Sequence, residues 1–332
     1  MRILILAAGS YIGRRLTQAL SSEPWAEVYA ATRRTVPGSR AGAHGVYVDV
    51  LDVKSVAAAI PQADAVINCV AGSAKAIAKG AANVYRLTAK QARPPLVIHM
   101  STMSVYGSAT GMVSETSPLI ADIGWYGRAK IEAEAHARAH ADAGGDLVIF
   151  RPGCVYGPGS TLWTYRIARL LESRRLGDLD SLGSGHCNLV YVDDVVRATL
   201  RVLRERSALG QVFNLADPRA GTWSAYLNAF AENLGISPPA HQARHRLWLE
   251  SRVVAPSLKI THMLVRRSGM SEWTPVVMPT SLTRLFGHDI QLDSHKAESL
   301  VGHWTSMGVG LKSAAAWYRN HDPQHVSALP AN

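Results

Sequence analysis

Cysteine is scarce in this chain of 332 residues. The three cysteines are Cys69, Cys154 and Cys187, and no two of them have Cys-x-x-Cys spacing. This scarcity argues against a disulfide framework and against a structural zinc site. Because it also suits a reducing compartment, we expect a cytoplasmic protein.

Long apolar runs are missing as well. No run approaches the ~18 residues that would suggest a membrane span. The opening "MRILILAAGS" is a short apolar run that leads directly into a glycine turn. We interpret it as a buried first strand rather than a signal peptide, and we expect no membrane partner.

Acidic residues are outnumbered, with 25 Asp and Glu against 35 Lys and Arg, which gives a formal net charge of +10. A basic balance is typical of nucleic-acid binding, but here no Lys/Arg block is interleaved with aromatic residues. Phosphate-bearing small molecules suit the scattered charge about as well. We expect no nucleic-acid partner.

Short apolar segments alternate with helical patterns through the first half of the chain. Near-continuous apolar strands that alternate with helices are typical of a parallel sheet covered on both faces. The sequence therefore predicts an α/β fold with a doubly wound parallel Rossmann sheet. The expected strands are residues 2–7, 27–32, 45–50, 64–70, 95–101 and 146–152, and the expected helices include residues 55–60, 79–92 and 128–143.

The second half is less regular. Residues 189–206 predict a strand that runs into a helix with Asp193 as its N-cap. Further along, a strand is expected over 212–218 and a helix over 221–235. The expected domains are a mainly dinucleotide-binding unit with the catalytic residues (1–235), a smaller substrate lobe over the carboxyl edge of the sheet (236–300), and a C-terminal helix and tail (301–332).

The turn "LAAGSYIGRRL" (6–16) follows the first strand and opens a helix. In such a turn, backbone N–H groups and the helix N-terminus face a pyrophosphate. Ala7 and Ser10 stand where glycines are usual. Because a left-handed alanine costs ~1–2 kcal/mol, we expect a negative φ at Ala7. The turn residues expected at the cofactor are Gly9, Ser10, Tyr11, Ile12 and Gly13.

The segment "ATRRT" (31–35) ends the second strand. NAD enzymes usually carry Asp or Glu here, which accepts hydrogen bonds from the ribose hydroxyls. This chain has Arg33 and Arg34 and no carboxylate. Because guanidinium groups bind phosphate well, the sequence predicts NADP, with NAD as the alternative.

Hydroxyl groups follow the fifth strand in "HMSTMSVYG" (99–107), and "WYGRAK" (125–130) opens the next helix. The carboxyl ends of parallel strands are where such folds bind ligands. Tyr126 and Lys130 are four residues apart and therefore share one face of the helix. Together these segments predict an acid–base site.

The chain resembles the extended short-chain dehydrogenase/reductases, the group that contains nucleotide-sugar epimerases, dehydratases and related ketoreductases. The resemblance covers most of residues 1–235. Its motifs occur in family order, and the C-terminal "AAAWYRNH" resembles the closing helix of the family. These motifs are the glycine turn, "DVLD", "NCVAG", "STMSVYG", "YGRAK", "RPGCVYGPG", "LVYVDDVV" and "FNLADP".

The resemblance implies a catalytic set of Thr102, Tyr126 and Lys130. A free phenol has a pKa of ~10, and the resemblance implies that Lys130 lowers the pKa of Tyr126 by ~1–3 units. It also implies a homodimer formed through the helices of "ANVYRLTAKQA" and "GRAKIEAEAHARA". Cofactor contacts are expected from Asp49 and Val50 at the adenine, Val70 and Ala71 at the ribose and diphosphate, and Pro152 and Val155 at the nicotinamide.

Departures from the family narrow the chemistry. Met103 and Ser104 replace the Asp-Glu pair of 4,6-dehydratases, and keto-sugar epimerase-reductases carry Cys at the position of Ser104. The arginine that grips a nucleotide-sugar diphosphate is replaced by Cys187 and Asn188. We expect substrate contacts from Ser104 and Asn188, with Arg174 or Arg175 as an alternative grip on an anion.

The favoured interpretation is an NADP-dependent oxidoreductase that reduces a ketone or oxidises a secondary alcohol. One alternative is a nucleotide-sugar 4-epimerase with retained NAD, and another is a non-catalytic dinucleotide-binding regulator. The histidine pairs 136/140 and 241/245 have helical i,i+4 spacing, but they lack further ligands, and we expect no metal.

Overall fold

The computed structural model describes residues 1–33, 42–206, 208–236, 244–255, 257–258 and 278–321. Its centre is a seven-stranded parallel sheet in the order β10-β7-β5-β4-β1-β2-β3, which confirms the predicted fold class. The strands are β1 (Arg2–Leu6), β2 (Glu27–Thr32), β3 (His44–Tyr47), β4 (Ala65–Asn68), β5 (Leu96–Met100), β7 (Leu147–Pro152) and β10 (Gln211–Leu215).

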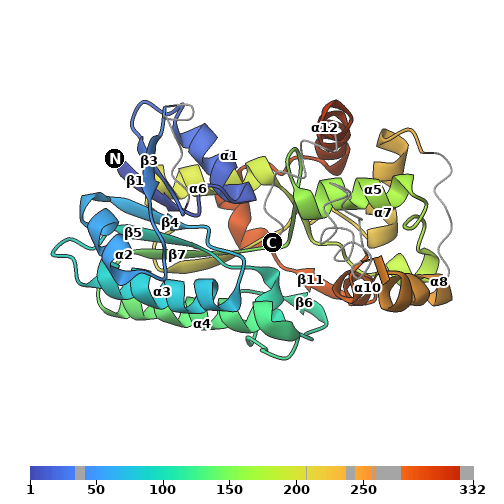
Figure 1. Ribbon diagram of the computed structural model, residues 1–332, viewed down its shortest axis with the longest axis horizontal. Helices are drawn as coiled ribbons and strands as arrows, with labels where there is room; N and C mark the ends of the chain where they lie inside the picture. The colour runs from blue at the N-terminus through green and yellow to red at the C-terminus, as the bar shows by residue number, and fades with distance from the viewer. Residues whose placement is uncertain (34–41, 207, 237–243, 256, 259–277, 322–332) are drawn as a thin grey trace, which may run out of the picture.

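Helices cover both faces of the sheet because alternate strand residues point to opposite sides. In β1, Ile3 and Ile5 pack beneath α1 and α6, whereas Leu4 and Leu6 pack against α2, α3 and α4. Figure 1 shows α1 and α6 on one side of the sheet and α2, α3 and α4 on the other. These helices are α1 (Tyr11–Leu20), α2 (Val53–Ala59), α3 (Ala74–Ala89), α4 (Gly124–Asp142) and α6 (Val192–Glu205).

A second lobe lies beside the sheet, to the right in Figure 1, around an aromatic core that includes Trp223, Tyr226 and Phe286. Residues 154–191 and 216–231 contribute to this core, so part of the lobe precedes residue 235. Its elements are β6 (Gly111–Val113), β8 (Cys154–Tyr156), α5 (Arg166–Glu172), β9 (Leu189–Tyr191), α7 (Trp223–Asn233), α8 (Arg244–Leu249), α10 (Thr280–Phe286), β11 (Ile290–Leu292) and α12 (Met307–Asn320). The short helix α11 (Glu298–Val301) instead packs against α6, on the sheet side. Two short parallel pairs, β6 with β11 and β8 with β9, complete the structure.

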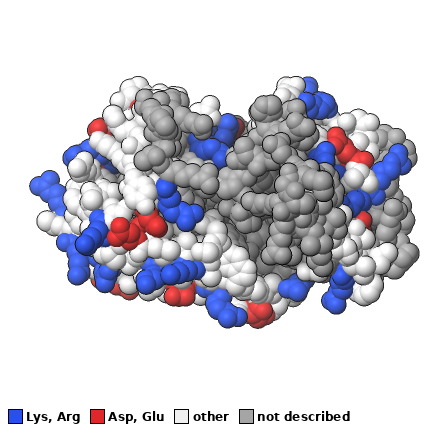
Figure 2. All heavy atoms as spheres, viewed as in Figure 1, with Lys and Arg blue, Asp and Glu red and all other residues white. Residues whose placement is uncertain are grey.

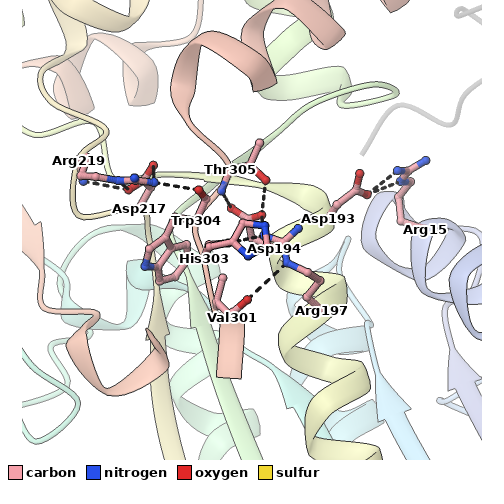
Figure 3. A network of polar contacts seen from close by, with 10 residues as sticks. All are labelled: Arg15, Asp193, Asp194, Arg197, Asp217, Arg219, Val301, His303, Trp304 and Thr305. Atoms are coloured by element: carbon pink, nitrogen blue, oxygen red, sulfur yellow. Dashed lines mark hydrogen bonds and ion pairs between the residues drawn. The ribbon is translucent and has the colours of Figure 1, made fainter. Parts of the chain in front are cut away.

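Polar contacts fix the segment that leads into α12 (Figure 3). The carboxylate of Asp194, on α6, accepts hydrogen bonds from Thr305 N at 3.0 Å and Thr305 Oγ1 at 2.6 Å. Arg219 Nη2, beyond β10, donates to Trp304 O at 2.9 Å. The C-terminal segment is thus tied to two elements that lie far away in the sequence.

The start of α6 differs from the prediction. Its N-cap is Tyr191, which makes no side-chain capping bond. Asp193 lies within the first turn, where its carboxylate accepts a hydrogen bond from Arg15 Nε at 3.2 Å. The helix therefore begins earlier than expected, and Asp193 joins α6 to α1.

Surface charge is dispersed. Figure 2 shows Lys and Arg side chains at many separate points on the visible face, interspersed with acidic ones. No helix of the described residues is long and apolar enough to cross a membrane.

Candidate active site

The turn after β1 closes tightly onto α1. Ser10 N donates to Ala7 O at 2.9 Å, and Ser10 Oγ caps the helix by accepting a hydrogen bond from Gly13 N at 3.2 Å. Ala7 has φ +55°, so the expectation of a negative φ was wrong. The left-handed residue lets the chain reverse while Ala8 N still donates to Ala31 O of β2 at 3.0 Å.

Gly13 is required by a close backbone approach. A Cβ at this position would lie 2.5 Å from Ala7 O, so any larger residue would push α1 away from the turn. The first helical turn also carries no acidic side chain. The first N–H groups of the helix therefore form a cradle that suits a dinucleotide pyrophosphate.

The end of β2 carries Arg33, whose side chain is exposed. Arg34 lies outside the described residues. Beyond β3, Asp49 Oδ1 accepts a hydrogen bond from Leu51 N at 3.0 Å. Val50 is held by α3, because Asn83 Nδ2 donates to Val50 O at 3.0 Å.

Lys130 is buried on α4, and its Nζ reaches the carboxyl ends of two strands. Nζ donates to Val70 O at 3.1 Å and to Met100 O at 2.6 Å. Val70 follows β4 and leads to Ala71, whereas Met100 ends β5. Burial lowers the pKa of Lys130 to about 8.

Tyr126 lies one helical turn before this lysine, as the spacing predicted. Lys130 Nζ is 6.0 Å from the centre of the Tyr126 ring, and no hydrogen bond between these two described residues joins it to the phenol oxygen. Burial raises the pKa of Tyr126 to about 12. The expected lowering is therefore not observed, because the ammonium donates to carbonyls while the phenol is desolvated.

Thr102 caps the short helix η2 (Met103–Tyr106). Its Oγ1 accepts a hydrogen bond from Ser104 N at 3.2 Å and donates to Ser104 Oγ at 3.3 Å. The two hydroxyl groups therefore lie together, at the place where the chain leaves β5. Gly127 brings α4 against this turn, since a Cβ there would lie 2.4 Å from Ser104 O.

We expect Gly127→Ala to displace the first turn of α4 from η2. Because the clash is with backbone, relief requires movement of Tyr126, and we expect a ~10-fold lower kcat with a stability loss of ~1–3 kcal/mol. The measurements are steady-state kinetics and thermal unfolding. Gly308→Ala is the matched control, because a Cβ there, on α12, would meet open space. Equal kinetics of the two variants would contradict the expected role of Gly127.

Pro152 and Val155 lie where the chain passes from β7 to β8, and both are buried. A Cβ at Gly153, between them, would lie 2.1 Å from Asn188 O, so this segment lies directly on the residue before β9. The ends of β1, β4, β5 and β7 share one edge of the sheet. The predicted cofactor and catalytic residues at these four strand ends therefore face one region.

The side-chain amide of Asn188 binds main-chain groups of β11 and is not free to contact a substrate. Its Nδ2 donates to Ile290 O at 2.7 Å, and its Oδ1 accepts from Leu292 N at 2.8 Å, which fixes β11. This engagement differs from the expected contact with substrate. Arg175 is likewise engaged by Glu250 at 2.9 and 2.7 Å. Arg174 lies at the surface.

The buried ion pair of Glu134 and Arg151 was not predicted from the sequence. Both side chains are 1% exposed, and two hydrogen bonds of 2.9 and 2.7 Å join them. Ser101 Oγ also donates to Glu134 at 2.5 Å. The spacing of Glu134, one turn after Lys130, is the signal that could have indicated this pair.

The described residues hold no group of three or more His, Cys, Asp and Glu side chains placed to bind a metal ion. His140 is buried, and its Nδ1 is hydrogen-bonded to Thr88 Oγ1 at 3.0 Å. His241 and the side chain of His245 lie outside the described residues.

The model of the NAD-dependent epimerase/dehydratase family matches residues 3–216. Among curated proteins, the chain is 28% identical over 149 residues to Protein YeeZ of Escherichia coli K12, which covers 44% of this chain and 49% of that protein. A non-canonical nonribosomal peptide synthetase of Aspergillus campestris is 31% identical over 153 residues, covering 41% of this chain and 14% of that protein. The chain thus spans about half, or less, of the curated relatives.

Solved structures share the whole fold. UDP-glucuronic acid 4-epimerase from Bacillus cereus, in complex with NAD, superimposes with a TM-score of 0.71 at 18% identity, covering 98% of this chain and 99% of that one. UDP-glucose 4-epimerase from Thermotoga maritima, with UDP-glucose, gives 0.72 at 19% identity and covers 96% and 99%. A human epimerase family protein with NADPH gives 0.70 at 18% identity and covers 95% and 99%.

Proposed function

Because this chain belongs to the NAD-dependent epimerase/dehydratase family, we propose that it is an NADP-dependent oxidoreductase that reduces a ketone or oxidises a secondary alcohol. The observation that carries this proposal is the shared position of Thr102, Tyr126 and Lys130 at the carboxyl edge of β4 and β5. When bound, the nicotinamide supplies or accepts the hydride.

In this mechanism the protein side chains move and hold the proton. Tyr126 gives its phenolic proton to the substrate oxygen during reduction and takes it back during oxidation. Its raised pKa keeps the phenol protonated at neutral pH, which is the form that reduction requires. Thr102 would orient the reacting oxygen. Lys130 would bind the nicotinamide ribose and supply a positive charge 6.0 Å from the centre of the Tyr126 ring, without a hydrogen bond to the phenol.

The cofactor would lie across the turn at Gly9, Ser10, Tyr11, Ile12 and Gly13, with its pyrophosphate at the start of α1. The exposed Arg33 supports an NADP preference because it is a cation at the end of β2. Asp49 and Val50 are proposed at the adenine, and Val70, Ala71, Pro152 and Val155 at the ribose and nicotinamide end. The three buried free cysteines support a cytoplasmic location.

A simple carbonyl or alcohol substrate is supported by what surrounds the hydroxyl groups. The two residues that follow Thr102 are Met103, which is buried and apolar, and Ser104, whose Oγ accepts a hydrogen bond from Thr102. Neither of them carries a carboxylate. Acid and base groups for water elimination are therefore missing at these positions.

The alternative is a nucleotide-sugar 4-epimerase with retained NAD, which is favoured by the structural likeness to UDP-sugar epimerases. Incubation with NADPH or NADH and a panel of ketones, secondary alcohols and UDP-sugars separates the possibilities. Net oxidation of NADPH supports the reductase. Inversion of a UDP-sugar without net cofactor turnover supports the epimerase, and binding without either reaction supports a non-catalytic regulator.

We also expect a homodimer formed through α3 and α4, which pack side by side. A groove across these helices holds Trp125, whose side chain is 54% exposed. Light scattering at micromolar concentration should give twice the mass of the chain, and Trp125→Ser should weaken association. Trp248→Ser, on α8 and similarly exposed at 55%, is the control. A wild-type monomer under these conditions would exclude the dimer.

A further inference from the structure

Three buried polar side chains form a hydrogen-bonded chain behind the active-site edge. Asn68 ends β4, Tyr85 lies on α3 and His99 lies on β5, and each is 2% exposed or less. Asn68 Nδ2 donates to the Tyr85 oxygen at 2.8 Å, and the Tyr85 oxygen is 2.5 Å from His99 Nδ1. No sequence motif indicated these hydrogen bonds.

The sheet register places these groups together. Asn68 and His99 are partners in the β4–β5 pairing, so their side chains leave the sheet on the same face, towards α3. The Tyr85 oxygen accepts from Asn68, and its own proton is available for His99 Nδ1 when the imidazole is the Nε2–H tautomer. In this tautomer the proton lies on Nε2, which is buried and has no hydrogen-bond partner among the described residues.

This arrangement is unfavourable for stability alone. An unpaired buried donor costs ~1–3 kcal/mol, whereas an apolar chain of similar shape would be nearly neutral. Burial, followed by the nearby Lys130 charge, also lowers the pKa of His99 well below its usual value, which keeps the ring neutral. A different advantage must explain the polar chain.

Asn68 and His99, the two outer residues of this hydrogen-bonded set, are each linked to one of the two carbonyl groups that accept from Lys130. Asn68 Oδ1 accepts a hydrogen bond from Val70 N at 3.0 Å, and Val70 O accepts one from Lys130 Nζ. His99 directly precedes Met100, whose carbonyl is the second acceptor. The polar chain and the ammonium therefore close a ring across the ends of β4 and β5.

The ammonium has no carboxylate as a direct partner among the described residues. The charged or titratable groups nearest to it are Cys69 on β4, His99 on β5, and Glu134 and Tyr126 on its own helix. Glu134 is already paired with Arg151. The alignment of the two carbonyls is therefore the main local stabilisation of the charged lysine.

We propose that Asn68, Tyr85 and His99 are positioning residues that hold the Val70 and Met100 carbonyls against Lys130 and thereby set the pH range in which the lysine is charged. This inference rests on the proposed function, in which the charged Lys130 supports Tyr126. Loss of the polar chain frees the carbonyls, weakens their hydrogen bonds to the ammonium and favours the neutral amine.

The direct test is the titration of Lys130 by NMR in protein labelled with ¹³C at lysine Cε, with Lys130→Arg identifying the resonance. The wild-type midpoint is expected at about pH 8. Tyr85→Phe removes one oxygen atom and should lower the midpoint by about one unit, equivalent to ~1.4 kcal/mol. The alkaline limb of kcat/KM should move to lower pH by a similar amount.

Thr88→Val is the matched control, because Thr88 is buried on α3 and its hydroxyl group contacts His140 and the main-chain carbonyl of Tyr85 but not the Tyr85 phenol. It should leave the midpoint and the pH profile unchanged. Asn68→Ala should reproduce the shift, and the double variant Asn68→Ala/Tyr85→Phe should add little, since both break one chain. Asn68→Ala also carries the test if Tyr85→Phe does not fold.

The outcomes separate this inference from the proposed function. An unchanged midpoint in Tyr85→Phe, or an equal shift in Thr88→Val, overturns the positioning role even if NADPH is oxidised normally. A shifted midpoint in a protein that turns over no substrate supports the positioning role, while the proposed function fails.

Discussion

Tyr126→Phe should lower kcat by ~10²–10⁴-fold, the usual contribution of a positioned acid–base group. Phenylalanine keeps the ring that packs beside Trp125 but has no proton to give to the substrate oxygen. Lys130 keeps both of its carbonyl partners, so NADPH affinity should change less than threefold. Steady-state kinetics and a fluorescence titration with NADPH measure the two effects separately.

Tyr29→Phe is the matched control for this loss. Its hydroxyl group donates a hydrogen bond to the nearby Glu27 carboxylate at 2.7 Å, and it lies on β2 away from η2 and α4. Its turnover should equal that of the wild type. If Tyr126→Phe also turned over at the wild-type rate, Tyr126 would not be the acid, and Thr102 or Ser104 would have to take that role.

NADPH should bind roughly ten- to a hundredfold more tightly than NADH. A hydrogen bond to a charged group is worth ~1.5–3 kcal/mol, and ~1.4 kcal/mol is tenfold in affinity. One contact between Arg33 and the 2′-phosphate therefore accounts for the preference. Dissociation constants for both cofactors, measured on the wild type, Arg33→Ala and Arg34→Ala, test it.

Arg93→Ala supplies the control for charge. Arg93 is equally exposed but lies just before β5, at the opposite edge of the sheet from the end of β2. Its removal should affect both cofactors equally and slightly. Equal affinity of the wild type for NADPH and NADH, or NAD that stays bound through purification, would refute the NADP preference and favour the epimerase.

The strands and the catalytic spacing could be predicted because both are local properties. Apolar runs such as residues 96–100 have few ways to leave water other than as buried strands, and the helical repeat alone puts Tyr126 and Lys130 on one face. The strand ends then follow from the parallel arrangement. This is why the predicted catalytic residues could be assigned to one edge of the sheet.

The second lobe could not be delimited in the same way. Its core collects residues from before and after 235, because the aromatic side chains of α7 and α10 pack together regardless of their distance in the sequence. The structural role of Asn188 also depends on a distant segment, because its amide binds β11, about a hundred residues later in the sequence. No local pattern carries such pairings.

The sequence by itself determined the sheet, the order of its strands along the chain and the candidate acid–base residues, since each depends on neighbours a few positions away. Only the tertiary structure decided the left-handed Ala7, the high pKa of Tyr126 and the Asn68–Tyr85–His99 chain. These depend on desolvation and on hydrogen bonds between separate elements. Desolvation and hydrogen bonds of this kind arise only when helices and strands pack together, and the spacing of apolar residues along the sequence does not specify them.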